Sequence, residues 1–157
     1  MANTVKAIPE GSEGATPYLA IKGAAAAIEF YKKAFGATEI MRMAGPDGRI
    51  GHAEIKIGKA KLMLADEHPE IGFLGPRTLG GSPITIHVYV EDVDALVAQA
   101  AASGAKVTRA VADQFYGDRA GQLEDPFGHV WFFATHKEDL SNEELQKRAA
   151  AFKPAGQ

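Results

Sequence analysis

The feature that most constrains the fold of this chain is an internal repeat. The segments Thr16–Thr38 and Thr85–Thr108 each begin with an alternating strand pattern, continue into a helical pattern and stop at Gly-Ala. Thr85 follows Thr16 by 69 residues, and Phe132 follows Met63 by the same 69 residues near the other end of the repeat. A matching offset at both ends indicates duplication. We therefore expect two similar modules.

Each module is predicted to have the order β-α-β-β-β. In the second copy, Val93, Leu96, Val97 and Ala100 recur with the spacing of one helix face, and Asp92 occupies the position of an N-cap. Between this helix and the last strand, each module has room for two further strands separated by turn residues. The sequence therefore predicts an α+β fold built from two βαβββ modules.

The repeat also divides the chain. We expect a disordered N-terminal tail over residues 1–14, a first module over 15–67 and a second module over 83–140. The connection over 68–82 is rich in Gly and Pro and is long enough for a functional loop or lid. Residues 141–157 begin with a capping box, Ser141 to Glu144, and are expected to form a C-terminal helix and tail.

Composition excludes several classes of function. The chain has 17 basic and 20 acidic residues, a net charge of −3 and no basic cluster, so no nucleic-acid partner is expected. It has no cysteine, which excludes disulfides, thiolate metal sites and a cysteine nucleophile. No apolar stretch is long enough for a signal peptide or a membrane span. We expect a cytoplasmic protein without a membrane partner.

Three sequence motifs in the second half indicate a family. They are Phe115–Arg119, Asp125–Trp131, which contains the turn Asp-Pro-Phe-Gly, and Ala134–Asp139. Together with the duplication, they resemble the PhnB-like branch of the vicinal oxygen chelate superfamily, the glyoxalase, bleomycin-resistance and dioxygenase group, over about residues 14–145. The resemblance implies that each module forms a curved mixed sheet around a cavity, usually with two modules facing each other.

The resemblance also implies where a metal would bind. Metal enzymes of the superfamily place ligands on the first and last strand of each module, and the aligned positions here are Thr16, Met63, Thr85 and Phe132. Divalent metals in such sites prefer imidazole or carboxylate ligands, which these residues lack. We therefore expect no metal at these positions and no cofactor, and a divalent metal held elsewhere is the alternative.

Strand periodicity separates two faces of each module. Successive strand residues point to opposite sides, and one side is entirely apolar: Pro17, Leu19, Ile21, Ala53, Ile55, Ile57, Ile86, Val88 and Val90. The other side carries Thr16, Tyr18, His52, Glu54, Lys56, Thr85, His87 and Tyr89. Periodicity alone leaves open whether this polar side faces solvent or a ligand. The cavity of the family lies on this side, which favours a binding pocket.

Three residues on the polar side are candidates for catalysis. His52 and Glu54 are two residues apart on one strand and therefore project into the same space. With His87 they are expected to converge on one space, either as a displaced metal site or as an acid–base pair. The alternative is that the two histidines form hydrogen bonds with structural neighbours.

Further residues are candidates for ligand binding. Arg119 has the chemistry to clamp a carboxylate or phosphonate, and Tyr116 to stack on a planar ligand, unless Asp118 and Arg119 pair with each other. Met63 and Phe132 would make the cavity floor apolar. The ligand-binding candidates are Tyr18, Met63, Thr85, Tyr116, Arg119 and Phe132.

The other histidines are interpreted as structural or surface residues. His129 alternates with Val130 toward the helices, as does Trp131, which we expect in the core. His68 and His136 are expected at the surface.

These patterns predict a glyoxalase/bleomycin-resistance-like protein that binds a small molecule without the usual metal ligands, as a ligand-sequestering protein does. Open sheet edges and an open concave face favour a homodimer. The alternative is a lyase or isomerase-type enzyme of the same superfamily that uses His52, Glu54 or His87.

Overall fold

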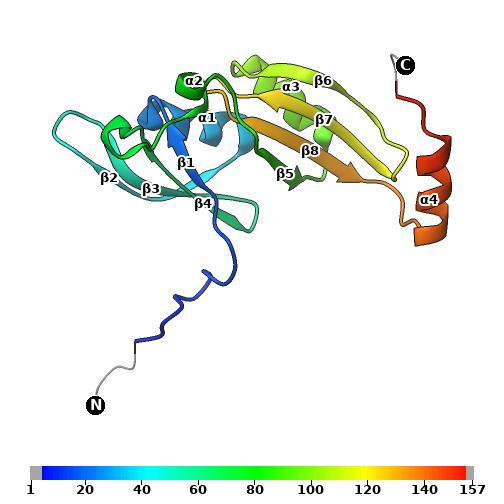
Figure 1. Ribbon diagram of the computed structural model, residues 1–157, viewed down its shortest axis with the longest axis horizontal. Helices are drawn as coiled ribbons and strands as arrows, with labels where there is room; N and C mark the ends of the chain where they lie inside the picture. Colours follow the sequence, from blue (N-terminus) through cyan, green and yellow to red (C-terminus); the bar gives the residue numbers. More distant parts are fainter. Residues whose placement is uncertain (1–4, 155–157) are drawn as a thin grey trace.

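The computed structural model describes residues 5–154 of the chain. Residues 1–4 and 155–157, which belong to the two predicted tails, lie outside the described residues. Residues 5–17 contain no helix or strand, and in Figure 1 this segment extends away from the first module.

The first module has the predicted order of elements. They are β1 (Tyr18–Ile21), α1 (Ala24–Phe35), β2 (Thr38–Ala44), β3 (Ile50–Ile57) and β4 (Ala60–Asp66). The four strands form a mixed sheet in the order β1-β4-β3-β2, in which β1 is parallel to β4 and the other pairs are antiparallel. Gly36 ends α1 in the left-handed conformation, with φ of 65°, as the Gly-Ala stop predicts.

The second module repeats this plan. Its elements are β5 (Thr85–Tyr89), α3 (Val93–Ala102), β6 (Lys106–Asp113), β7 (Asp118–Glu124) and β8 (Val130–His136), and its sheet has the order β5-β8-β7-β6. Asp92 caps α3 by accepting a hydrogen bond from the Ala95 N–H. Tyr18 lies opposite Met63, and His87 opposite Phe132, so the 69-residue offset holds in the register. The predicted α+β fold of two βαβββ modules is confirmed.

The connection between the modules is partly ordered by local structure. It contains a short 3-10 helix, η1 (Pro69–Ile71), and one turn of helix, α2 (Pro76–Leu79). Its beginning is anchored by Glu67, whose Oε1 accepts a hydrogen bond of 2.6 Å from the Gly75 N–H. His129 of the second module lies 3.0 Å from the carbonyl oxygen of Ala20, at the free edge of β1. The two sheets therefore lie side by side and in contact (Figure 1).

One hydrophobic core serves both modules. α1 and α3 pack against each other and against one face of each sheet, and Phe35 of α1 contacts the rings of Trp131 and Phe133. Burying side chains of this size stabilises a fold by about 1.5–3 kcal/mol each. The apolar side predicted for the strands packs in or against this core: Leu19, Ile21, Ala53, Ile55, Ile57, Ile86, Val88 and Val90. Pro17, predicted on the same side, is exposed.

A buried carboxylate joins the two modules. Asp125, only 1% exposed, begins the Asp-Pro-Phe-Gly turn. Its Oδ2 accepts hydrogen bonds from the Tyr31 hydroxyl of α1 (2.6 Å) and from Nε1 of Trp131 (2.9 Å). Its Oδ1 accepts from the N–H groups of Phe127 and His129. The turn motif therefore holds the first helix against the second sheet, and Trp131 is in the core as predicted.

In each module, a side chain at the end of the last strand accepts hydrogen bonds from N–H groups at the start of the helix. Asp66, at the end of β4, accepts hydrogen bonds from the N–H groups of Gly23, Ala24 and Ile50. Thr135 follows Asp66 by the same 69 residues and accepts a hydrogen bond from the N–H of Val93, at the start of α3. Orphan N–H groups at helix starts require such acceptors.

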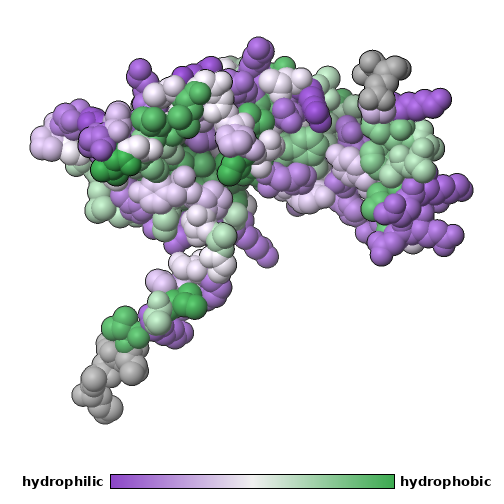
Figure 2. Space-filling model, in the orientation of Figure 1, coloured by the Kyte–Doolittle hydropathy of each residue, from purple (hydrophilic) through white to green (hydrophobic). Residues whose placement is uncertain are grey.

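The C-terminal helix α4 (Asn142–Ala151) lies beyond the far end of the second sheet (Figure 1). Ser141 caps it by accepting a hydrogen bond from the Glu144 N–H, as the capping box predicts. None of its residues is buried, and its surface combines hydrophilic residues with alanines (Figure 2). No helix within residues 5–154 has the length and apolar character needed to cross a membrane.

Candidate functional site

Most of the candidate residues lie on the sheet faces that turn away from α1 and α3, which we call the open faces. On the open face of the first module, four residues directly opposite one another form a row across the whole sheet: Tyr18, Met63, Glu54 and Met41. His52 lies in the next row, opposite Met43. Residues opposite each other on neighbouring strands share a face. Met41 and Met43, which are 36% and 56% exposed, were not among the predicted site residues.

Tyr18, His52 and Glu54 form a hydrogen-bonded chain. The Tyr18 hydroxyl lies 2.6 Å from Nδ1 of His52, and Nε2 of His52 lies 3.4 Å from Oε1 of Glu54. Burial and the charge of Glu54 raise the pKa of Tyr18, so its hydroxyl keeps its proton. When the hydroxyl donates to Nδ1 of His52, Nε2 directs its own proton at the Glu54 carboxylate. This arrangement orients an imidazole on an accessible surface.

Two neighbours frame this chain. Lys61 Nζ lies 3.6 Å from Oε2 of Glu54, which keeps the carboxylate paired. The ring of Phe73, from the connection between the modules, packs edge-on against Tyr18 with 5.5 Å between ring centroids. The connection therefore forms one side of this face.

The open face of the second module has an equivalent row with different chemistry. His87, Phe132, Gln122 and Arg109 lie opposite one another on β5, β8, β7 and β6. The His87 ring lies 5.1 Å from the Phe132 ring and 4.8 Å from the Tyr89 ring, measured between centroids. Gln122 and Arg109 were not among the predicted site residues. Thr85 is exposed at the start of β5, opposite Val130.

A second hydrogen-bonded group lies at the end of this face. Asp118, 4% exposed, accepts from the Tyr89 hydroxyl (2.7 Å) and from Nδ1 of His136 (2.8 Å), and Nε2 of His136 donates to Asp139 (2.8 Å). Bonds to Asp139 and Asp118 raise the pKa of His136. The side chain is half-exposed, as expected of a surface histidine, yet both of its nitrogens are bound to carboxylates.

The structure places Arg119 and Tyr116 outside the rows. Arg119 binds Asp94 of α3 through Nε (2.6 Å) and Nη2 (2.8 Å) and Asp113 through Nη1 (3.2 Å). The bidentate geometry predicted for Arg119 is therefore formed with a protein carboxylate, and the partner is Asp94 rather than Asp118. Tyr116 lies in the β6–β7 turn, where burial and the charge of Asp118 raise its pKa.

The predicted trio divides between the two modules. His52 and Glu54 lie together, whereas His87 contacts Tyr89 and Phe132 on the other sheet. Among residues 5–154, no group of three or more His, Cys, Asp or Glu side chains has the arrangement needed to hold a metal ion. At the family ligand positions, a thioether on Met63 and a phenyl ring on Phe132 do not fit a divalent metal that prefers imidazole or carboxylate.

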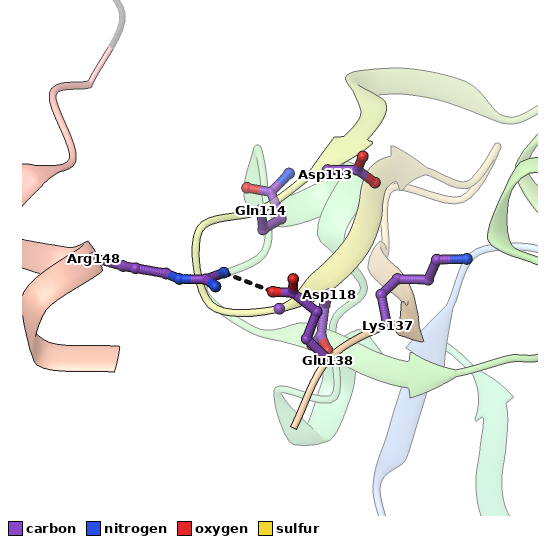
Figure 3. A pocket seen from close by; sticks show the side chains of 7 residues that line it. Asp113, Gln114, Asp118, Lys137, Glu138 and Arg148 are labelled. Atoms are coloured by element: carbon purple, nitrogen blue, oxygen red, sulfur yellow. Dashed lines mark hydrogen bonds and ion pairs between the residues drawn. The ribbon is translucent and has the colours of Figure 1, made fainter. Parts of the chain in front are cut away.

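A separate cavity of about 250 Å³ lies where the C-terminal segment crosses the β6–β7 turn (Figure 3). Its charged side chains are largely paired. Arg148 of α4 binds Glu138 at 2.6 Å, as Figure 3 shows, and Asp118 is held by Tyr89 and His136. The Phe152 ring packs at a tilt against the Phe115 ring, with 4.8 Å between centroids. We assign these contacts to the docking of α4.

Comparison with known proteins gives the family. The sequence model of the Glyoxalase/Bleomycin resistance protein/Dioxygenase superfamily matches residues 16–133. An uncharacterized protein of Mycobacterium tuberculosis is 42% identical over 134 residues, covering 83% of this chain and 79% of that protein. An Arabidopsis thaliana gene product is 32% identical over 125 residues, covering 74% of each chain.

Solved structures agree. The X-ray structure of the Arabidopsis gene product matches with a TM-score of 0.64 and 26% identity, covering 77% of this chain and 97% of that chain. A PhnB protein from Bacillus cereus has the same fold, with a TM-score of 0.62 and 16% identity over 78% of this chain and 99% of that chain. This chain therefore belongs to the Glyoxalase/Bleomycin resistance protein/Dioxygenase superfamily.

Proposed function

We propose that the protein binds a small molecule on its open faces without a metal at the usual family positions. The observation that supports this most directly is the chain of Tyr18, His52 and Glu54. Its imidazole is oriented by hydrogen bonds on both sides, yet Tyr18 remains 45% exposed. Oriented polar groups beside apolar side chains, here Met41, Met43 and Met63, are typical of small-molecule sites.

We propose that the binding protein is a homodimer. Tyr18 is 45% exposed on the first open face and Tyr89 is 59% exposed on the second. A single chain therefore leaves both faces without a cover. A symmetric second copy would cover them and exclude water from a bound ligand. Sedimentation equilibrium at micromolar protein concentration should give twice the mass of the chain. A monomer at that concentration would count against the dimer.

A second candidate function is acid–base catalysis. The same hydrogen-bonded chain favours it, because Nδ1 of His52 lies within hydrogen-bond distance of the Tyr18 hydroxyl and Nε2 faces Glu54. A ligand that is only sequestered would stay unchanged on the protein, whereas a substrate of an isomerase or lyase would be converted. NMR spectra of a bound ligand over time distinguish the two, and His52→Gln should abolish conversion while the fold is retained.

The binding function is tested with a thermal-shift screen of a small-molecule library. His52→Ala, Glu54→Ala and His87→Ala are the test variants. His68→Ala is the matched control, because His68 lies in the connection and contacts Glu70. Compounds that raise the melting temperature of the wild type and of the control should raise it less in at least one test variant. Equal shifts in all proteins would refute binding at the open faces.

A further inference from the structure

One arginine of the described chain differs from all the others. Every other arginine donates to a carboxylate or a carbonyl oxygen: Arg42 to Glu39 and Glu29, Arg49 to the Glu67 carbonyl, Arg77 to Glu124, Arg119 to Asp94 and Asp113, and Arg148 to Glu138 and Glu144. Arg109 is exposed and has no such partner within residues 5–154. Its guanidinium therefore retains its donors for another molecule.

A β-bulge aims Arg109 at the open face. In β6, Val107 lies opposite Leu123 and Arg109 opposite Gln122, so Thr108 is an extra residue. Leu123 is fully buried in the core, and Gln122, the next residue of β7, therefore points to the open face. Gln122 Nε2 donates to Thr108 Oγ1 at 3.2 Å, which places this part of the bulge on the same side. Bulges commonly redirect a side chain in this way.

The row that contains Arg109 has the chemistry of an anion site beside an apolar surface. It holds a guanidinium, an amide, a phenyl ring and an imidazole, and it contains no carboxylate. The equivalent row of the first module does contain a carboxylate, because Glu54 occupies the position that Gln122 occupies in the second module. The row of the second module therefore offers an anion a cation that has no carboxylate partner among the described residues, whereas the charged group in the row of the first module is Glu54, which is paired with Lys61.

We propose that Arg109 binds the anionic group, a carboxylate, sulfonate or phosphonate, of a ligand whose flat apolar body lies on Phe132 and His87. This rests on the proposed binding function and adds the class of ligand. A guanidinium binds such groups through two parallel hydrogen bonds, which a lysine cannot reproduce. The competing explanation is that Arg109 only protects an edge strand from pairing, as charged edge residues do.

Two fluorescent probes separate these explanations. 8-Anilino-1-naphthalenesulfonate and N-phenyl-1-naphthylamine share one aromatic body, and only the first carries a sulfonate. The wild type should bind the sulfonate probe at least tenfold more tightly than the neutral probe. Arg109→Ala should weaken binding of the sulfonate probe by about tenfold and leave the neutral probe unaffected, and Arg109→Lys should fall between.

The matched control is Lys106→Ala, which removes one exposed positive charge from the same edge strand, opposite Glu124. It should leave both affinities unchanged, and far-UV circular dichroism should show every variant folded. Equal losses in Arg109→Ala and Lys106→Ala would overturn the anion site in favour of general charge or edge protection. Equal affinity for the two probes in the wild type would overturn it while leaving the binding function standing. No binding of either probe would count against both proposals.

Discussion

The open faces of the two modules share a strand order and differ in side-chain chemistry. The first bulge of the outer strand also recurs, since Ile40 is the extra residue of β2 as Thr108 is of β6. The side chains in the rows have all changed: Tyr18, Met63, Glu54 and Met41 in the first module correspond to His87, Phe132, Gln122 and Arg109 in the second. The core thus constrains the backbone of each copy, and the rows are free to diverge.

The sides that face the core are apolar in both modules, but the turns before the last strands differ. The second module turns from β7 into β8 through Asp125 and its four hydrogen bonds, whereas the first module turns from β3 into β4 at Gly58 and Lys59. The second turn therefore also stabilises the contact between the modules, because one of its bonds comes from Tyr31. Variants at equivalent places should reveal this asymmetry.

The largest effect is expected for Asp125→Ala. The substitution leaves the buried Tyr31 hydroxyl and the buried Trp131 N–H without an acceptor, at a cost of about 3–5 kcal/mol in the free energy of unfolding. Urea unfolding followed by the fluorescence of Trp131, the single tryptophan, measures it directly.

The control for this measurement is Asp47→Ala, in a turn of the first module. Asp47 is exposed and accepts a hydrogen bond from the Arg49 N–H at 3.1 Å. Its removal should leave the free energy of unfolding nearly unchanged. If both aspartates proved equally dispensable, Asp125 would not hold the modules together.

An intermediate effect is expected at the two helix starts. Asp66→Ala removes an acceptor of three N–H groups, and Thr135→Ala removes an acceptor of one, which also donates to the Val90 carbonyl. Caps of this kind contribute about 0.5–2 kcal/mol. We expect about 2 kcal/mol for Asp66→Ala and about 1 kcal/mol for Thr135→Ala in urea unfolding. A larger loss for Thr135→Ala than for Asp66→Ala would show that the number of N–H groups accepted does not set the contribution of each cap.

The regular parts of the site could be predicted from the sequence. In β1, β3 and β5 the alternation of polar and apolar residues is uninterrupted, and it assigned Leu19, Ile55 and Val88 to the core side. That places Tyr18, His52 and His87 on the other side, because strand period permits nothing else. The family resemblance supplied the turn at Asp125 and the absence of family ligands at Met63.

The outer strands could not be predicted in this way. The bulges at Ile40 and Thr108 shift the period by one residue, so Met41 and Arg109 carry no alternation signal. Ion pairs between residues far apart in the sequence could not be predicted either. Arg119 binds Asp94, a residue of α3, and His136 binds Asp118 across the sheet. No local pattern encodes either contact.

The smallest effects on stability are expected in the segments that follow the last strand of each sheet, β4 and β8. Glu67 follows β4 and anchors the connection between the modules, while His136 ends β8 and anchors the segment that leads to α4. Hydrogen bonds from Thr78 and Gly75 lower the pKa of Glu67. Hydrogen bonds to Asp139 and Asp118 raise the pKa of His136.

These shifts make opposite contributions to stability as the pH changes. The stability from Glu67 is complete above its ordinary pKa of 4.5 and is lost as the pH falls through its lowered value. The stability from His136 is complete below its ordinary pKa of 6.5 and is lost as the pH rises through its raised value. The urea midpoint of Glu67→Gln should therefore approach that of the wild type as the pH falls below 4.5, and that of His136→Gln should do so as the pH rises above 6.5. Because His136 is half-exposed, the change expected for its variant is small. For either variant, a difference from the wild type that stays constant with pH would show that the anchor acts without its charge.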